Sequence, residues 1–247
     1  MEKTIRTLPW PGISAECFRG ITQSFPAPAH FHEELVIGLM EEGTRTLICG
    51  SSRMDIQSGD LFMIPRWCAH ACYCAENHVS GWRVLRVDSA WRPARILNRK
   101  RNLSREFLRL HDRLMYGSAD SRELSDFLAR FKEAAGTAPD APAPAALDLV
   151  KSLQTCSSQR IHLSDLPALC GYSAASAQRI LSAHTGLSVH QALTSLRVQD
   201  SRRLLENGLS LSRTAMEAGF ADQSHFTNQF AAVMGITPGK WISQRKK

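Results

Sequence analysis

Two similar segments determine the predicted fold: Gly171–Leu193, GYSAASAQRILSAHTGLSVHQAL, and Gly219–Trp241, GFADQSHFTNQFAAVMGITPGKW. Each begins with glycine and an aromatic residue, passes through a polar opening into a helical pattern, and closes on Gly–apolar–Ser/Thr. A short helical pattern precedes each copy, with Ser164 or Ser212 as the expected N-cap. The opening glycine ends that first helix, because glycine adopts a left-handed backbone most easily. The sequence therefore predicts two helix-turn-helix units in tandem.

The second helix of each unit has an apolar face and a polar face, because residues three or four positions apart share one side of a helix. We expect inward packing from Ala177, Ile180, Leu181, His184, Phe226, Phe230 and Val233. The outward positions are Ala175, Gln178, Arg179 and Ser182 in the first unit, and Gln223, Ser224, Thr227 and Asn228 in the second. Gln, Asn and Arg can hydrogen-bond base edges in the major groove. The alternative is an ordinary solvated face, which two copies in one basic segment disfavour.

The net charge is concentrated in this part of the chain. From Lys151 onward, eleven Lys/Arg and five Asp/Glu give +6 of the total +7, and residues 1–150 contribute +1. A basic segment of this kind attracts a phosphate backbone. No apolar run of about 18 residues is present, and Met1–Trp10 lacks the apolar core of a secretory signal, so we expect a cytoplasmic protein without membrane contact. The seven irregularly spaced cysteines argue against a disulfide framework.

The motifs of this half resemble the DNA-binding domain of the AraC/XylS family of bacterial regulators. They read LxxLCGYSxxSxQRxL, TGLS, RxxxSRRLL, LSxTAxEAGFADQSHFTxQF and MGITPxxW in order, over about residues 161–241. The resemblance implies seven helices, with a linker helix over Ser188–Glu206 that lets both units enter successive major grooves of double-stranded DNA. It assigns base contacts to the outward residues named above, apart from Ser182, which shares their face, and a contact toward phosphate to His225. RNA polymerase is a further candidate partner.

The resemblance also implies backbone contacts from a pool of basic residues, and it is imperfect at a few positions. The pool consists of Arg160, Arg197, Arg202, Arg203, Arg213 and Lys240. Ala177, Leu181 and Ala192 are smaller or less aromatic than the family pattern, and Asn228 stands where Arg is usual. We therefore expect looser packing and less specificity from the first unit.

The N-terminal half has a different pattern. Short apolar runs separated by turn residues occur at Leu35–Met40, Arg45–Gly50, Ser58–Pro65 and Gly81–Val87. They predict a small antiparallel barrel or sandwich, and the run H-x-H, Glu, IGL, GD, P and H resembles the cupin-like effector domain of the same family. We expect an α+β multidomain protein with a cupin-like β-barrel at residues 1–97, a helical and candidate dimerisation segment at 98–135, a Pro/Ala-rich linker at 136–146, and the DNA-binding domain at 147–247.

Three histidines are candidate effector ligands. His30 and His32 are two positions apart, so on a strand they would face one side, and His70 could complete a group in the barrel mouth. Three explanations stay open: a divalent metal site made by His30, His32 and His70, a polar ligand pocket, or buried satisfied histidines. Glu34 lies on the same predicted face, and Trp82 could add an apolar wall to a pocket.

Taken together, the sequence predicts a DNA-binding transcription regulator controlled by a small molecule or a metal in its N-terminal barrel. One alternative is a cupin metalloenzyme with an appended DNA-binding domain, although no further catalytic constellation accompanies the histidines. Another is a ligand-independent architectural protein that binds DNA with little specificity. The candidate cysteine and histidine cluster at Cys68–His78 could also bind a metal or sense redox state, but its spacing is not a standard zinc pattern.

Overall fold

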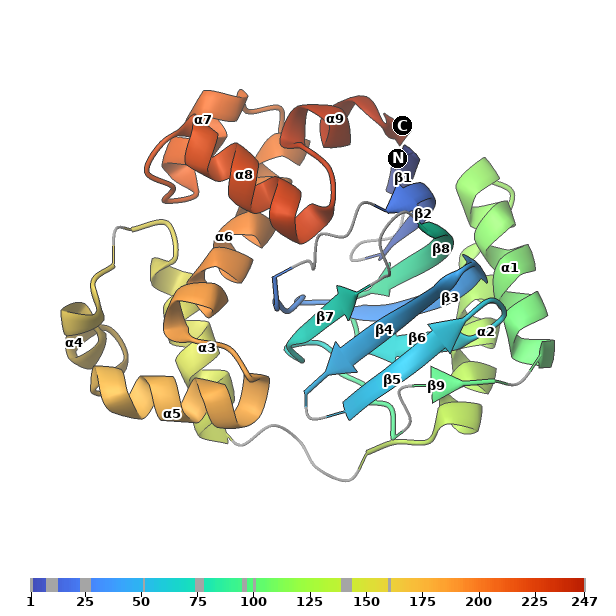
Figure 1. Cartoon of the computed structure of the whole chain (residues 1–247), viewed down its shortest axis with the longest axis horizontal. Coiled ribbons are helices and arrows are strands. Elements are labelled where there is room, and N and C mark those ends of the chain that lie inside the picture. The colour runs from blue at the N-terminus through green and yellow to red at the C-terminus, as the bar shows by residue number, and fades with distance from the viewer. Residues whose placement is uncertain are drawn as a thin grey trace.

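The computed structural model describes residues 2–7, 13–22, 28–50, 52–73, 78–94, 97–99, 101–138, 144–159 and 161–246. The N-terminal half is rich in strands, and the C-terminal half is helical (Figure 1). The strands are β1 Glu2–Thr7, β2 Ile13–Thr22, β3 Leu35–Glu42, β4 Thr44–Cys49, β5 Ser52–Gln57, β6 Leu61–Ile64, β7 His70–Tyr73, β8 His78–Val87, β9 Leu97–Asn98 and β10 Arg245–Lys246. The helices are α1 Arg101–Tyr116, α2 Ser121–Ala135, α3 Pro144–Cys156, α4 Leu166–Cys170, α5 Ala174–Thr185, α6 Val189–Glu206, α7 Leu211–Glu217, α8 Gln223–Met234 and α9 Pro238–Ser243.

The strands form two sheets, of order β10-β1-β2-β8-β3-β6-β9 and β5-β4-β7. All four predicted apolar runs coincide with strands of these sheets. The predicted barrel is not closed, because β4 pairs with β5 on one side and β7 on the other, and these described strands do not pair with the larger sheet. The large sheet ends on two-residue strands at both edges, so its ladder stops there rather than closing.

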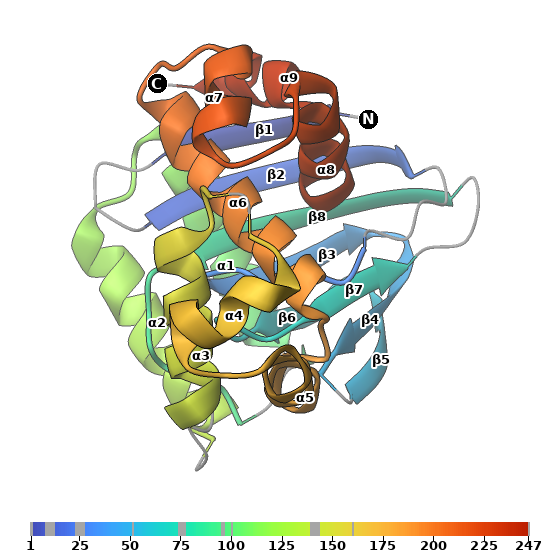
Figure 2. The same cartoon turned by 90° about the vertical axis from the view of Figure 1, so that its left-hand side faces the viewer.

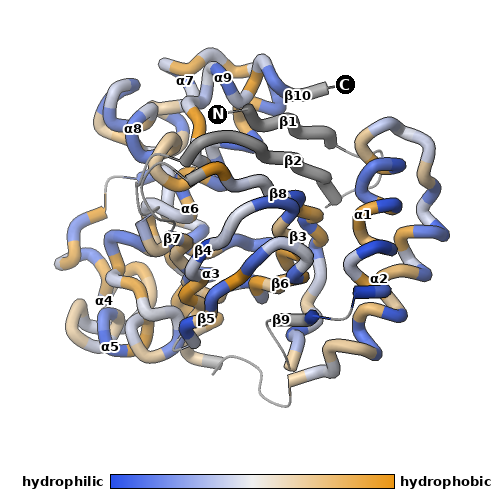
Figure 3. The backbone as a smooth tube through the Cα atoms, turned by 45° about the vertical axis from the view of Figure 1, so that its right-hand side comes forward, coloured by the Kyte–Doolittle hydropathy of each residue, from blue (hydrophilic) through white to orange (hydrophobic). Residues whose placement is uncertain are grey.

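Strand β3 is buried on both faces, which explains its uninterrupted apolar run. Leu35, Ile37 and Leu39 pack toward α1 and α2, whereas Val36 and Met40 pack toward the small sheet. The N-terminal half is therefore three-layered, with the large sheet between the small sheet and the helix pair. Figure 3 shows α1 and α2 alongside the large sheet, with hydrophobic and hydrophilic residues alternating along both helices.

Helices α1 and α2 occupy the predicted helical segment, with residues 117–120 between them. Asp120 begins α2 with a capping box, because its carboxylate accepts from the Glu123 amide while Glu123 caps the Asp120 amide. The apolar faces of both helices, including Phe107 and Phe127, are buried against the large sheet. These faces suggested a dimer surface from sequence, but the sheet already covers them.

Seven α-helices, α3 to α9, lie in the described residues of the C-terminal half, as the family resemblance implies. Helix α3 begins at Pro144, inside the segment 136–146 that we expect to be a linker, because proline is well tolerated in a first helical turn. The prolines at 139 and 142 lie outside the described residues. The linker helix is α6, capped by Ser188 and ending at Glu206, as expected. No helix in the described part of the chain is long and apolar enough to span a membrane.

Helix α6 joins two separate hydrophobic cores. Its first half, up to Leu196, packs with α3, α4 and α5, and its second half, from Val198, packs with α7, α8 and α9. Figure 2 shows α6 running between the two helix-turn-helix units. Each unit thus has its own core, and a single stiff helix sets the spacing between them.

The turns and caps of both units follow the predicted plan with two corrections. Gly171 and Gly219 have φ values of 74° and 78°, the left-handed geometry expected of them. Helix α7 is capped by Ser210 rather than Ser212, since the Ser210 hydroxyl accepts from the Arg213 amide. Ser164 does not cap α4 either, because it lies within a 3-10 turn, Leu163–Asp165, that precedes the helix.

Candidate functional site

The second helices of the two units, α5 and α8, are the candidate DNA-reading elements. Ser173 begins α5 and Asp222 begins α8, each accepting a hydrogen bond from an amide in the first turn. Most of the predicted outward side chains are exposed: Ala175, Gln178, Arg179, Ser182, Gln223, Ser224 and Asn228. Thr227 and His225 are partly buried. The polar faces therefore lie at the surface, where a groove could receive them.

The inward faces are as predicted with one exception. Ala177, Leu181, Phe226 and Phe230 are fully buried. His184 is exposed, and Thr185 takes the inward place instead, donating its hydroxyl proton to the Leu181 carbonyl. The exception arises at the last turn of α5, where the chain turns toward Gly186.

Gln178 is engaged within the protein itself. Its side-chain oxygen accepts from the Val189 amide at 3.2 Å, and its side-chain nitrogen donates to the Ser182 hydroxyl at 2.7 Å. These bonds tie α5 to the start of α6. In the first unit, Arg179 is then the long outward side chain best placed to reach a base edge.

Three of the predicted phosphate-contacting arginines are used inside the molecule. Arg197 donates to the carbonyls of Ser157 and Gln159 at 2.8 and 2.9 Å. Arg202 and Arg203 form ion pairs with Glu34 and Glu33 of the N-terminal half. In this arrangement Arg202 and Arg203 hold the two halves together. Arg213 instead pairs with Glu217 on its own helix. Arg160 lies outside the described residues.

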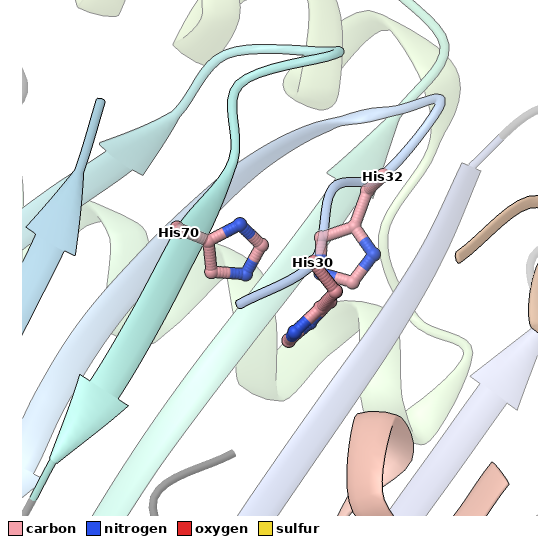
Figure 4. Close-up of side chains that lie close together, drawn as sticks. All are labelled: His30, His32 and His70. Carbon is pink, nitrogen blue, oxygen red and sulfur yellow. The ribbon is translucent and has the colours of Figure 1, made fainter. Parts of the chain in front are cut away.

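The three candidate histidines do meet (Figure 4). His30, His32 and His70 are each about 95% buried, and their candidate ligand atoms all lie within 4.8 Å of one another. The predicted strand for His30 and His32 is absent. Instead, His30 forms an isolated antiparallel bridge with His70, with backbone N–H···O distances of 3.1 and 2.8 Å, while His32 follows it in an irregular segment.

Backbone carbonyls fix the tautomers of two of these rings. His30 Nδ1 donates to the Pro28 carbonyl at 2.8 Å, and His70 Nδ1 donates to the Cys68 carbonyl at 3.3 Å. Because a carbonyl can only accept, the ring lone pair is on Nε2 in both. Outer hydrogen bonds of this kind orient the histidine ligands of metal sites.

The surroundings of His32 and His70 favour their neutral forms. Burial, followed by the charge of Arg86, lowers the pKa of His32 well below its usual value. Burial, followed by the neighbouring His30, lowers the pKa of His70 in the same way. Neutral imidazole is the form that binds a metal ion, whereas an ion pair with an anionic effector would need the protonated form.

Among the described residues, Glu34 is not in the group of candidate ligands that the three histidines form. The Glu34 carboxylate pairs with Arg202 at 3.2 Å and with Arg86 at 3.8 Å. Trp82 lies under the Arg45 guanidinium, 4.3 Å from its ring centroid, and four positions before Arg86 on β8. Four strand residues span about 13 Å. Trp82 therefore lies about 13 Å along β8 from Arg86, the residue that pairs with Glu34.

The histidine-bearing segment 29–34 also joins the two halves. Phe31 is fully buried among C-terminal residues such as Leu153 and Leu193. The Glu33 amide donates to the Gln199 side chain at 2.7 Å, and Gln154 donates to the Glu33 carboxylate. The same six residues thus carry two of the three candidate ligands and the contacts with α3 and α6.

Sequence reasoning missed the interdomain residues Phe31, Glu33 and Gln199, and also Arg86. Phe31 stands between the two histidines of the H-x-H run and gave a signal, since a large apolar side chain there must be buried. Its partners in the C-terminal half lie more than 100 positions away, and no local pattern identifies them.

The chain matches two family models. Residues 11–135, a little over half of the chain, match the AraC-like ligand binding domain, and residues 168–244 match a helix-turn-helix domain. The chain belongs to the AraC family of transcription regulators. It is an AraC-type DNA-binding regulator with an N-terminal ligand-binding domain, which sets aside the enzyme and architectural alternatives.

Relatives and solved structures agree with this membership. The regulator is 26% identical to the HTH-type transcriptional regulator YbfI of Bacillus subtilis, over 91% of this chain and 90% of that protein. It is 31% identical to the activator RhaR of Salmonella dublin over 41% of this chain and 38% of that protein. ToxT of Vibrio cholerae has the same fold, with a TM-score of 0.66 at 12% identity, over 94% of this chain and 99% of that one.

Proposed function

We propose that this regulator reads DNA through α5 and α8 and is controlled by a divalent metal ion bound to His30, His32 and His70. The observation that carries the proposal is the position of the three buried imidazoles on the segment that docks the DNA-binding half. A ligand alters activity only if it prefers one arrangement of the protein. An ion that draws the rings together would act directly on that docking segment.

The histidines fit a metal in donor type and orientation. Zinc–nitrogen bonds of about 2.0–2.1 Å in a tetrahedral site place ligand nitrogens about 3.3 Å apart. The present separations, up to 4.8 Å, require small ring movements toward a common centre. Three protein ligands would leave a fourth position for water or a small molecule.

A cobalt titration of the full-length protein tests the site. Tetrahedral Co²⁺ absorbs visible light, so binding is read directly, and competition with Zn²⁺ gives the relative affinity. We expect one equivalent of Co²⁺ to bind. Because His70 is a proposed ligand, His70→Gln should weaken Co²⁺ binding by about 100-fold or more. Loss of a residue that only hydrogen-bonds a ligand weakens metal binding by about 10–100-fold. His111→Gln is the matched control, because His111 is equally buried but lies on α1, where it contacts the Val84 carbonyl. Equal loss in both variants would refute the site.

Selection of bound sequences from random DNA tests the other half of the proposal. Full-length protein is used at about 150 mM salt, where non-specific binding is weak. We expect a motif of two parts one helical turn apart, since α6 spaces two separately folded units. A single half-motif would show that only one of the two helices reads bases. Substitutions in α5 and in α8 would then show which helix binds that half-motif.

A second candidate effector is an organic carboxylate. Arg86 and Arg202 are both more than 90% buried and converge on the Glu34 carboxylate across the domain boundary. ToxT structures contain an unsaturated fatty acid or a butenoic acid derivative. In this regulator an incoming carboxylate would replace Glu34 between the two arginines. We expect Glu34→Gln to tighten carboxylate binding, which calorimetry with a fatty acid would measure, and an unchanged affinity would contradict it.

Three further predictions concern partners and location. From membership of the AraC family we infer contact with RNA polymerase, assembly into a homodimer and a cytoplasmic location. Sedimentation of the full-length protein with and without Zn²⁺ would test the dimer. Because the apolar faces of α1 and α2 pack on the large sheet, a dimer through these helices would use their outer faces.

A further inference from the structure

Two cysteines from different parts of the N-terminal half lie side by side. Cys49 ends β4, Cys68 lies in the turn before β7, and their sulfur atoms are 2.8 Å apart. The pairing of β4 with β7 creates this proximity, because Cys49 is in register with His70 and the Gly50 amide donates to the Ala69 carbonyl. A disulfide has a sulfur separation of about 2.05 Å, so a movement of less than about 1 Å would close it.

The two thiols differ in exposure. Cys49 is 2% exposed and packs in the core between the sheets, whereas Cys68 is partly exposed. An oxidant arriving from solvent therefore reaches Cys68 first, with Cys49 behind it as the second thiol. Redox-sensing cysteines commonly combine an accessible thiol with a nearby resolving one.

The turn that carries Cys68 is strained and touches the domain boundary. Trp67, next to Cys68, has a φ of 61°, a left-handed conformation that a bulky residue rarely adopts. Its amide donates to the His32 carbonyl at 2.8 Å, and its ring packs against Phe31 with centroids 5.4 Å apart. Strained residues persist only where the surroundings hold them, and they are frequent in switch regions.

We propose that Cys49 and Cys68 form a peroxide-sensitive pair whose disulfide shifts the Trp67 turn and thereby the seat of Phe31 on the DNA-binding half. The Cys68 sulfur attacks hydrogen peroxide, breaking the O–O bond to give a sulfenic acid and water. The Cys49 sulfur then attacks the Cys68 sulfur, forming the S–S bond and releasing a second water. Two thiols lose two electrons and two protons, and one peroxide becomes two waters. The pair works without any ion at the histidines.

Peptide mapping after peroxide treatment tests the chemistry. The full-length protein is oxidised, its remaining thiols are alkylated, and it is digested with trypsin without reduction. We expect a dithiothreitol-sensitive link between the peptide 46–53, which contains Cys49, and the peptide 67–83, which contains Cys68. The link disappears in Cys68→Ser and persists in Cys72→Ser, the matched control on the same peptide. In Cys49→Ser, dimedone traps the Cys68 sulfenic acid.

The opposite pattern would overturn the pairing: a link lost in Cys72→Ser but kept in Cys68→Ser, or two freely alkylated thiols at Cys49 and Cys68 after peroxide. Thermal melting confirms that each serine variant is folded. The regulatory step is tested by DNA affinity of the reduced and oxidised protein for a selected duplex. We expect a change of about fivefold or more in Kd, absent from Cys49→Ser. A complete cross-link with unchanged affinity would overturn the switch.

Discussion

At the scale of single residues, the outward face of α5 depends on Arg179. Gln178 is held by Val189 and Ser182, and Ala175 offers no hydrogen-bonding group. Arg179 is exposed in the middle of the helix, and a guanidinium can bond both acceptors of a guanine edge. Recognition by the first unit therefore rests mainly on this side chain.

We predict that Arg179→Ala weakens binding to the selected operator by about 1–3 kcal/mol and relaxes the preference at one base pair. The reason is the loss of a bidentate contact that only the correct base satisfies. Binding of operators substituted at each position measures the effect. Arg130→Ala is the control, since Arg130 is also exposed but pairs with Glu106 in the N-terminal half. An equal loss on every sequence would mean that Arg179 contacts phosphate.

At the scale of elements, the two helix-turn-helix turns look alike in sequence but differ in their surroundings. Gly171 and Gly219 share a left-handed φ. A side chain at Gly171 would enter open space, whereas a Cβ at Gly219 would lie 2.7–2.8 Å from the carbonyl oxygens of Ser158 and Ser157. The turn of the second unit is packed against the segment after α3.

We predict that Gly219→Ala lowers the free energy of unfolding by about 2–4 kcal/mol and that Gly171→Ala lowers it by about 1 kcal/mol. Both variants place alanine in a left-handed conformation, which costs about 1–2 kcal/mol, and only the first adds steric overlap with backbone atoms. Urea unfolding of both full-length variants gives the comparison. Equal losses would show that the backbone near Ser157 yields to the added methyl group.

The sequence predicts elements better than it predicts their assembly, for a physical reason. The repeat and the strand β3 follow from local periodicity, which a short window contains, whereas the linker helix was implied by the family resemblance. Closure of the barrel depends on whether distant strand edges pair, and no pattern in β4 or β7 records that choice. The His30, His32 and His70 group was found because an H-x-H run is itself a local signal. The Cys49–Cys68 pair was missed because strand pairing brings it together.

At the scale of the whole molecule, the coupling between halves passes through a few side chains of one segment. Phe31 enters the first core of the DNA-binding half, and Glu33 and Glu34 pair with Arg203 and Arg202 on α6. The last strand, β10, also pairs with β1 at the edge of the large sheet. The exposed Arg203 pair contributes at most about 1 kcal/mol, whereas a fully buried phenyl ring contributes about 3–5 kcal/mol.

We therefore predict that Phe31→Ala uncouples the two halves. Removing a fully buried phenyl ring costs about 3–5 kcal/mol, and here that loss falls on the contact between domains. Urea unfolding of the wild type should be a single transition, whereas the variant should show two. Metal binding should persist, because the histidine side chains remain, but DNA affinity should no longer depend on metal. Phe107→Ala removes an equally buried ring from the core between α1 and the sheet, so it should destabilise the N-terminal half and retain the metal response. A Phe31→Ala protein that keeps both a single transition and a metal-dependent affinity would show that coupling runs through β10 or the ion pairs instead.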